Sequence, residues 1–159
     1  MTNPMADSLT FMMGNHPAVL PGELLYCKNH MWCRPGPEGV LTFGFSAYAV
    51  RLMQDVYFLE WRIDPGLVTA KQEIGYIETQ KATSGLYAPI AGRILRFNAA
   101  LLEDPSTINV DSYGCGWLFE MTGDPNGATL DARGYHDHLA ATWDATQRML
   151  KGQVTREDA

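Results

Sequence analysis

The central part of the chain is a series of short β-type segments that glycine and proline interrupt, and this pattern limits the fold more than any other feature of the sequence. Residues 40–45 alternate, with Leu41, Phe43 and Phe45 on one face, which is the period of a half-buried strand. Residues 56–61 are apolar on both faces and predict a covered strand. Short strands at this spacing are typical of a β-sandwich or a flattened barrel.

Further strands are predicted at about residues 73–79, 86–97 and 116–121. Pro89 and Gly92 belong at a corner, a bulge or an edge, because neither residue suits the middle of a regular ladder. Ser46 is a candidate N-cap for a short helix after the first strand. The expected fold class is therefore mostly β, with one short helix inserted between strands.

A C-terminal helix is predicted from residues spaced by three and four, which form one stripe: Leu139, Trp143, Thr146 and Leu150. We expect this helix to cover an open part of the β core and to stop at Gly152, because glycine is a common helix terminator.

The length of 159 residues favours one domain with tails. Residues 1–22 carry several prolines and glycines with little periodicity, so we expect a flexible N-terminal arm. The domain itself is expected at residues 23–152, including the C-terminal helix, and residues 153–159 are expected to form a frayed tail.

Charge and composition exclude several classes of function. The formal net charge of −6 argues against an extended nucleic-acid surface, which needs clustered Lys and Arg. No apolar run approaches membrane-spanning length, and no Lys or Arg precedes Lys28, as a presequence would require. We therefore expect a cytoplasmic protein without a membrane partner. Cys27, Cys33 and Cys115 cannot all pair with one another and are expected to be reduced.

Neither a catalytic nor a metal site is predicted. The sequence lacks a nucleophile elbow, a phosphate loop and an HExxH motif. His136 and His138 are two residues apart, which places them on different faces of the predicted helix and not on the shared face that metal binding requires.

One lysine has a distinctive position. Lys81 lies between two predicted strands and is followed by the small residues Ala82, Thr83 and Ser84. Small neighbours leave an amine accessible to a modifying enzyme, although exposed hairpin lysines commonly serve only solubility.

The motifs around this lysine resemble those of the glycine-cleavage H proteins, relatives of the lipoyl and biotinyl domains. YCKNHMW at residues 26–32 is similar to Y-x-x-x-H-E-W, and GFSAYA at 44–49 is similar to G-I-T-x-Y-A. ETQKA at 78–82 resembles the lipoylation sequence E-S-V-K-A, and YAPIAG at 87–92 resembles Y-A-P-x-x-G. The longest match is NAALLEDPSTINVDSYGCGW at 98–117. The motifs occur in the family's order.

This resemblance implies a flattened β-sandwich of lipoyl-domain type, the barrel-sandwich hybrid, with lipoic acid in amide linkage to Lys81 and no catalysis by the carrier itself. By resemblance, Glu78 would help the lipoylating enzyme to recognise the hairpin, and Gly92 would let the second strand turn a corner. The implied partners are glycine decarboxylase, aminomethyltransferase, dihydrolipoamide dehydrogenase and the lipoylating enzyme. The implied function is to shuttle an aminomethyl group and reducing equivalents in glycine cleavage.

Two positions depart from the family pattern near the expected lodging cleft of the arm, for which His30, Met31 and Gly85 are the candidates. Met31 stands where the family has Glu, and Gly85 stands where it often has an acidic residue. An ammonium group without these carboxylates would be held less firmly.

Two other functions remain open from sequence. One is an H-like lipoyl carrier of another pathway, such as sulfur oxidation or lipoate relay. The other is an unmodified β-sandwich adaptor in which Lys81 is merely exposed.

Overall fold

The computed structural model describes residues 7–158, with side chains for residues 7–150. The strands are β1 (Leu9–Met13), β2 (His16–Leu20), β3 (Leu25–Cys27), β4 (Met31–Pro35), β5 (Val40–Phe45), β6 (Val56–Trp61), β7 (Gly66–Val68), β8 (Glu73–Thr79), β9 (Thr83–Tyr87), β10 (Gly92–Phe97), β11 (Phe119–Gly123) and β12 (Thr129–Leu130). The helices are the 3-10 turn η1 (Pro37–Gly39), α1 (Ala47–Met53), α2 (Ala100–Glu103), α3 (Thr107–Val110) and α4 (Ala132–Asp158).

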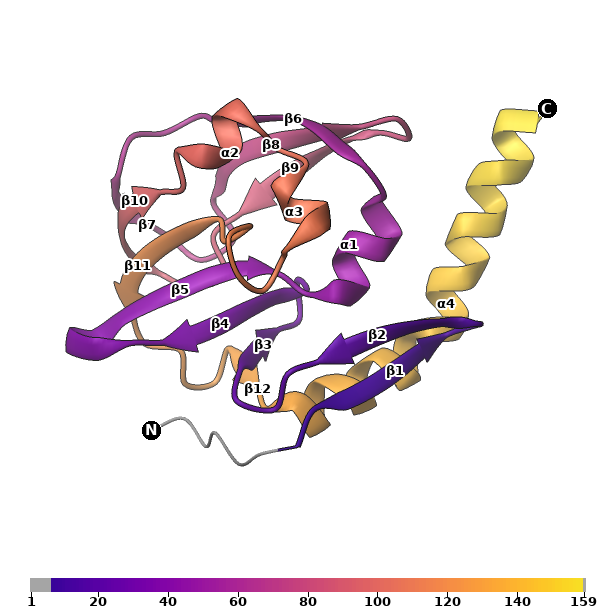
Figure 1. The fold of residues 1–159 in the computed structure, drawn as a ribbon, viewed down its shortest axis with the longest axis horizontal. Coiled ribbons are helices and arrows are strands. Elements are labelled where there is room, and N and C mark those ends of the chain that lie inside the picture. Colours follow the sequence, from indigo (N-terminus) through magenta and orange to yellow (C-terminus); the bar gives the residue numbers. More distant parts are fainter. Residues whose placement is uncertain (1–6, 159) are drawn as a thin grey trace.

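Two antiparallel sheets form the body of the molecule, and their inner faces enclose the main core (Figure 1). The larger sheet has the order β12-β3-β4-β5-β11-β10-β7, and the smaller one has the order β6-β8-β9. The predicted β-sandwich is confirmed. Fully buried residues from both sheets meet in this core, among them Phe43, Ile74, Ile77, Ile94 and Phe119. Ser46 caps α1 as predicted, because its hydroxyl accepts a hydrogen bond from the Ala49 amide at 3.2 Å.

The chain changes sheets between β9 and β10, at the corner predicted from Pro89 and Gly92. Pro89 lies in the connection, and Gly92 begins β10 opposite Gly123. A Cβ atom at position 92 would collide with the carbonyl oxygen of Thr122, so only glycine allows this close approach of β10 to β11.

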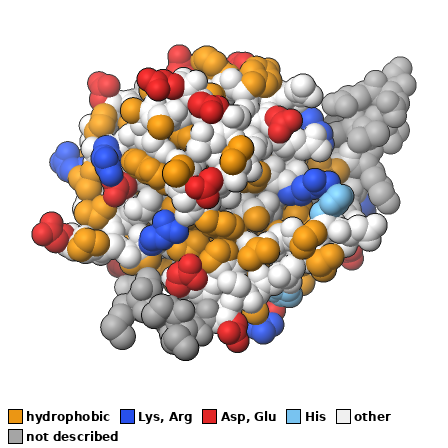
Figure 2. Space-filling view, in the orientation of Figure 1, with side chains coloured by type: hydrophobic (Ala, Val, Ile, Leu, Met, Phe, Trp, Pro, Cys, Tyr) orange, Lys and Arg blue, Asp and Glu red, His pale blue; other side chains and the backbone are white. Residues whose placement is uncertain are grey.

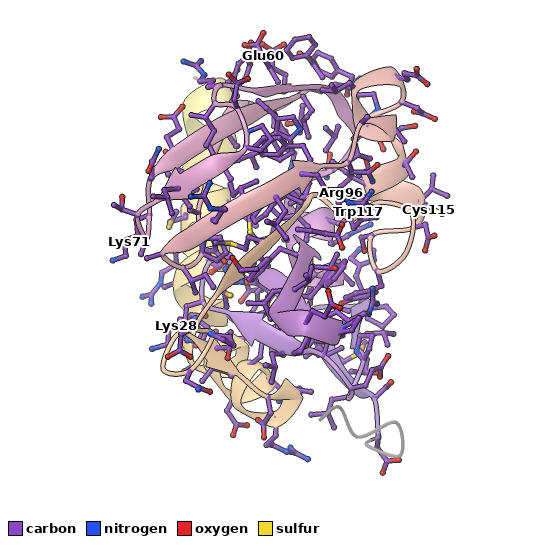
Figure 3. The ribbon with its side chains drawn as sticks, turned by 90° about the vertical axis from the view of Figure 1, so that its left-hand side faces the viewer. Lys28, Glu60, Lys71, Arg96, Cys115 and Trp117 are labelled. Carbon is purple, nitrogen blue, oxygen red and sulfur yellow. The ribbon has the colours of Figure 1, made fainter. Side chains whose placement is uncertain are left out.

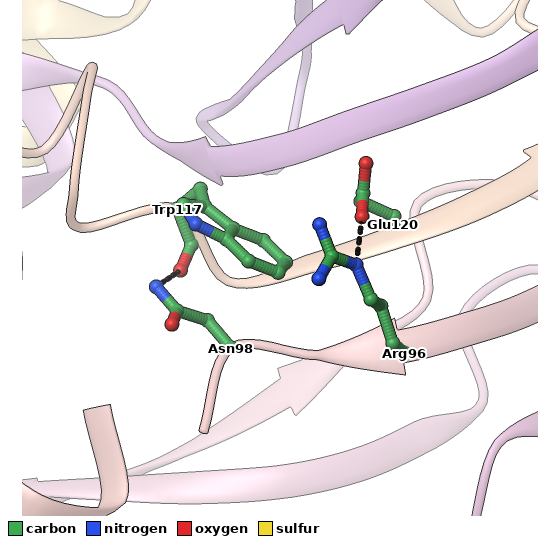
Figure 4. Close-up of polar contacts among 4 residues, drawn as sticks. All are labelled: Arg96, Asn98, Trp117 and Glu120. Carbon is green, nitrogen blue, oxygen red and sulfur yellow. Dashed lines mark hydrogen bonds and ion pairs between the residues drawn. The ribbon is translucent and has the colours of Figure 1, made fainter. Parts of the chain in front are cut away.

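Asn98 anchors the loop that follows α3 (Figure 4). Its buried side-chain amide donates to the carbonyl oxygens of Cys115 and Trp117, at 2.9 and 2.8 Å. Arg96 lies over the Trp117 ring and forms an ion pair with Glu120. Asn98 therefore joins the first residue of the long motif at residues 98–117 to its last residues.

A second core lies between α1, α4 and a two-stranded hairpin formed by β1 and β2 (Figure 1). Phe11, Leu20, Tyr26, Tyr135 and Leu139 are buried in it. The hairpin occupies residues 9–20, where the sequence predicted a flexible arm. Buried and exposed side chains alternate along its two five-residue strands. The hairpin is ordered because the buried side chains pack against distant parts of the chain, and local composition does not reveal such contacts. Residues 1–6 of the predicted arm lie outside the described residues.

The C-terminal helix packs through the predicted stripe. Leu139 is buried, whereas Trp143, Thr146 and Leu150 are half-buried. The helix does not stop at Gly152 but continues to Asp158, which differs from the sequence prediction. A single glycine costs a helix only about 1 kcal/mol, and no proline follows it to enforce an end.

Trp143 should contribute measurably to stability through this second core. Its ring makes edge contacts with Phe11 and Tyr48, at centroid distances of 5.8 and 6.0 Å. Because the ring is only half-buried, we expect Trp143→Ala to lower the free energy of unfolding by about 2–3 kcal/mol, less than for a fully buried tryptophan. Denaturant unfolding measures this change. Met149→Ala, at an exposed position of the same helix, is the control, and an equal effect of both variants would contradict the packing role.

Candidate functional site

Lys81 lies at the tip of the β8–β9 hairpin, which projects from the smaller sheet (Figure 1). Three residues, Gln80, Lys81 and Ala82, join the strands, and the Thr79 amide donates to the Ala82 carbonyl at 3.0 Å to close the turn. The Lys81 side chain is exposed. A loop this short has little freedom, so the lysine is presented at a defined place.

The side chain of Thr79 organises the turn from within. Its hydroxyl accepts hydrogen bonds from the amides of Lys81 and Ala82, at 3.2 and 3.3 Å. Thr79 is buried, and the sequence analysis did not select it. A threonine that ends a strand directly before a short loop was the available signal, because Ser and Thr hydroxyls commonly bond nearby backbone groups in turns.

Glu78 lies on β8, where it pairs with Thr83 of β9 on one side and with Phe58 of β6 on the other. It is half-buried and forms no ion pair with another described residue. Its carboxylate is thus available to an external partner that approaches the lysine.

A cleft of about 170 Å³ lies beside this hairpin. Its walls are mainly apolar with a few polar groups; the lining residues are Asn29, His30, Phe45, Ala49, Leu52, Met53, Ile77, Ser84, Gly85 and Leu86. Ser84 and Gly85 follow Lys81 by three and four residues on β9. At about 3.3 Å per residue, the cleft therefore begins within roughly 10–13 Å of the lysine.

The structure brings two of the three cleft candidates together. His30 and Gly85 line the cleft, whereas Met31 does not. The Met31 side chain is only 2% exposed and belongs to the main core; Met31 begins β4 and pairs with Phe45 of β5. At Gly85, the hydroxyl of Tyr87 lies 2.6 Å from where a Cβ atom would be. No Asp or Glu lines the described cleft.

His30 connects the cleft with the C-terminal helix. Its Nδ1 atom lies 2.9 Å from the Tyr135 hydroxyl, which also lies 2.9 Å from the Ser46 hydroxyl. Burial, and to a smaller extent the proximity of His138, lowers the pKa of His30 to about 4. His30 is therefore neutral at physiological pH.

A second and larger hollow, of about 670 Å³, adjoins the cleft at Asn29. Four chain segments line it: Cys27, Lys28, Asn29, Lys71, Tyr87, Ala88, Pro89, Gly127, Ala128, Thr129 and Leu130. Lys28 and Lys71 lie on the same side of the molecule (Figure 3).

Other candidate chemistries find little support in the described residues. The side chains described, those of residues 7–150, include no group of three metal ligands, and no described helix is long and apolar enough to cross a bilayer. Burial raises the pKa of Cys27 and of Cys33 to about 12, so neither thiol is a ready nucleophile. On the face drawn in Figure 2, basic side chains are interspersed with acidic and apolar ones.

A β-sandwich that presents one lysine on a tight hairpin, with an apolar cleft beside it, defines a carrier domain. The comparisons agree. The family model described as glycine cleavage H-protein matches residues 24–133. The glycine cleavage system H protein of Pseudoalteromonas atlantica is 37% identical over 123 residues, which cover 76% of this chain and 95% of that protein.

The H protein of Psychrobacter cryohalolentis is 40% identical over 105 residues, covering 66% of this chain and 83% of that protein. The crystal structure of the H protein from Mycobacterium marinum superposes with a TM-score of 0.68 at 32% identity, covering 76% of this chain and 99% of that one. The chain therefore belongs to the glycine cleavage H-protein family, and it is a carrier component and not itself a catalyst.

The Thr79 hydroxyl should support both stability and presentation of the lysine. Thr79→Val keeps the shape of the side chain but leaves two amides of the turn without their acceptor, so we expect the free energy of unfolding to fall by about 1–2 kcal/mol. Thr79→Ser should restore most of the loss. Equal stability of the Val variant and the wild type, measured by denaturant unfolding, would show that the hydroxyl is dispensable.

The low pKa of His30 predicts a pH-dependent stability. The unfolded chain binds a proton at this histidine below its ordinary pKa of 6.5, whereas the folded chain does so only near 4. Stability should therefore fall as pH decreases from about 6.5 to 4, with this group contributing at most about 3 kcal/mol. His30→Gln should remove this part of the pH dependence. His16→Gln, at an exposed histidine, is the control, and an unchanged profile in His30→Gln would refute the assignment.

Proposed function

We propose that Lys81 carries lipoic acid in amide linkage and that the chain serves as the lipoyl carrier of glycine cleavage. The observation that carries this proposal is the position of an exposed lysine in a three-residue hairpin loop next to an apolar cleft of about 170 Å³. Glu78 is proposed to assist recognition by the lipoylating enzyme, because it lies next to the tip and pairs with no described cation.

The residues of the cleft fit such a group. A dithiolane and its methylene tether are apolar, and most of the cleft wall consists of apolar side chains such as Phe45, Leu52 and Ile77. The bound group would supply a redox-active disulfide that also accepts a one-carbon amine. The protein's own part is to project Lys81 from a rigid turn and to offer a water-poor resting place beside it.

Tethering explains why such a protein needs no active site of its own. A carried group on a long arm reaches successive enzymes at a high effective concentration without diffusing freely. The proposed partners are glycine decarboxylase, aminomethyltransferase and dihydrolipoamide dehydrogenase, between which an aminomethyl group and reducing equivalents would pass. We propose that this takes place in the cytoplasm.

The cleft offers a carried ammonium group few anionic partners. With Met31 in the core and glycine at position 85, the described lining contains only neutral polar groups, such as those of Asn29, His30 and Ser84. His30 does not repel the carried ammonium group, because burial lowers the pKa of His30 to about 4 and the imidazole is neutral. This lining favours binding of the loaded arm through apolar contacts rather than through ion pairs.

The proposal is tested by intact-mass analysis of protein produced in lipoate-supplied cells with an active lipoylating enzyme. We expect one lipoyl adduct, mapped to Lys81 by peptide analysis and absent from Lys81→Arg. Lys71→Arg, on another exposed turn, is the matched control and should keep the adduct. A wild-type protein that stays unmodified under conditions in which a second lipoyl protein is modified would refute the assignment of Lys81.

A further inference from the structure

The larger hollow is distinct from the cleft beside Lys81 and has the size of a small-molecule site. Its volume of about 670 Å³ falls within the range of about 300–1,000 Å³ that is usual for ligand pockets. Ala88, Pro89 and Leu130 contribute apolar wall, and the two lysines Lys28 and Lys71 contribute charge. Such a combination suits a ligand with an apolar body and an anionic group.

The charge of this hollow is the opposite of that of the whole molecule. The chain carries a net charge of −6, yet two of its few lysines line one hollow that no described Asp or Glu enters. Within the described residues, neither Lys28 nor Lys71 forms an ion pair. An ammonium group without a carboxylate partner is free to bind an external anion.

Both lysines stand on turns that backbone hydrogen bonds fix in place. The His30 amide donates to the Cys27 carbonyl at 2.9 Å and closes the turn that carries Lys28. The Lys71 amide donates to the Ala88 carbonyl at 2.8 Å, which ties its turn to the wall of the hollow. The two cationic groups are therefore attached to a preformed frame.

Lys71 also adopts a backbone conformation that favours glycine. Its φ angle is +70°, in the left-handed region, where a side chain is a cost and not a benefit to the fold. His30, Glu38 and Gln54 also have positive φ angles, so this conformation makes Lys71→Gly a well-tolerated variant and does not by itself indicate a function.

We propose that this hollow binds a small organic anion, a carboxylate or phosphate attached to an apolar body, between Lys28 and Lys71. The ammonium groups contact the anion, and the apolar body lies against Ala88, Pro89 and Leu130. Lys81 does not line the hollow, so binding does not depend on modification of that lysine. A failure of lipoylation and a failure of anion binding are thus separate outcomes.

The test is a titration of the full-length protein followed by amide NMR shifts, with three probes. Hexanoate has both charge and apolar body, hexan-1-ol has the body alone, and inorganic phosphate has the charge alone. We expect hexanoate to bind most tightly and to shift resonances at the two lysine turns. The double variant Lys28→Gln with Lys71→Gln should bind hexanoate at least about tenfold more weakly, because two charged contacts are lost.

Two control variants distinguish loss of this binding site from a change in overall charge and from a loss of stability. Arg93→Gln removes one positive charge at an exposed position outside the hollow and should leave hexanoate binding unchanged. Lys71→Gly removes the ammonium at the left-handed position and should weaken binding without lowering the Tm. Equal binding of hexan-1-ol and hexanoate, equal binding of phosphate and hexanoate, or undiminished binding by the double variant would each overturn the proposal.

Discussion

The register between β8 and β9 is the constraint on which the site depends. Ile77 and Leu86 point into the core and are almost completely buried, so a slip of one residue would expose them and bury polar neighbours. This burial fixes the pairing of Glu78 with Thr83 and leaves a loop of three residues after Thr79, with Lys81 in its middle. The same inward-facing residues form part of the cleft wall, so one packing arrangement sets both the position of the lysine and the surface beside it.

The second core adds a support that the family match does not cover. The matched segment spans residues 24–133, whereas β1, β2 and most of α4 lie outside it. They share the second core with Tyr135 of α4, whose hydroxyl lies within hydrogen-bond distance of both Ser46 and His30. Ser46 caps α1, and α1 contributes Ala49, Leu52 and Met53 to the cleft. The β1–β2 hairpin and α4 thus support α1, which forms one wall of the cleft.

Local sequence was sufficient for much of the framework. Alternation in residues 40–45, the cap at Ser46 and the punctuation by Pro89 and Gly92 are properties of neighbouring residues, and each predicted the element or the corner that the structure contains. The placement of Lys81 between two strands was readable for the same reason. The ordered motifs then indicated the family, which the comparisons show.

Contacts between distant segments decided the rest. Met31 was predicted to be a cleft residue beside His30, but its side chain is buried in the main core and does not line the cleft. The hairpin at residues 9–20 is ordered by burial against α4. Lys28 and Lys71 line one hollow although they are more than 40 residues apart in the chain. The sequence by itself determined several central strands, the lysine hairpin and the family, because these follow from local periodicity and short motifs. Only the tertiary structure decided which side chains face the cleft, the core and the second hollow, because burial is set by packing partners that are remote along the chain.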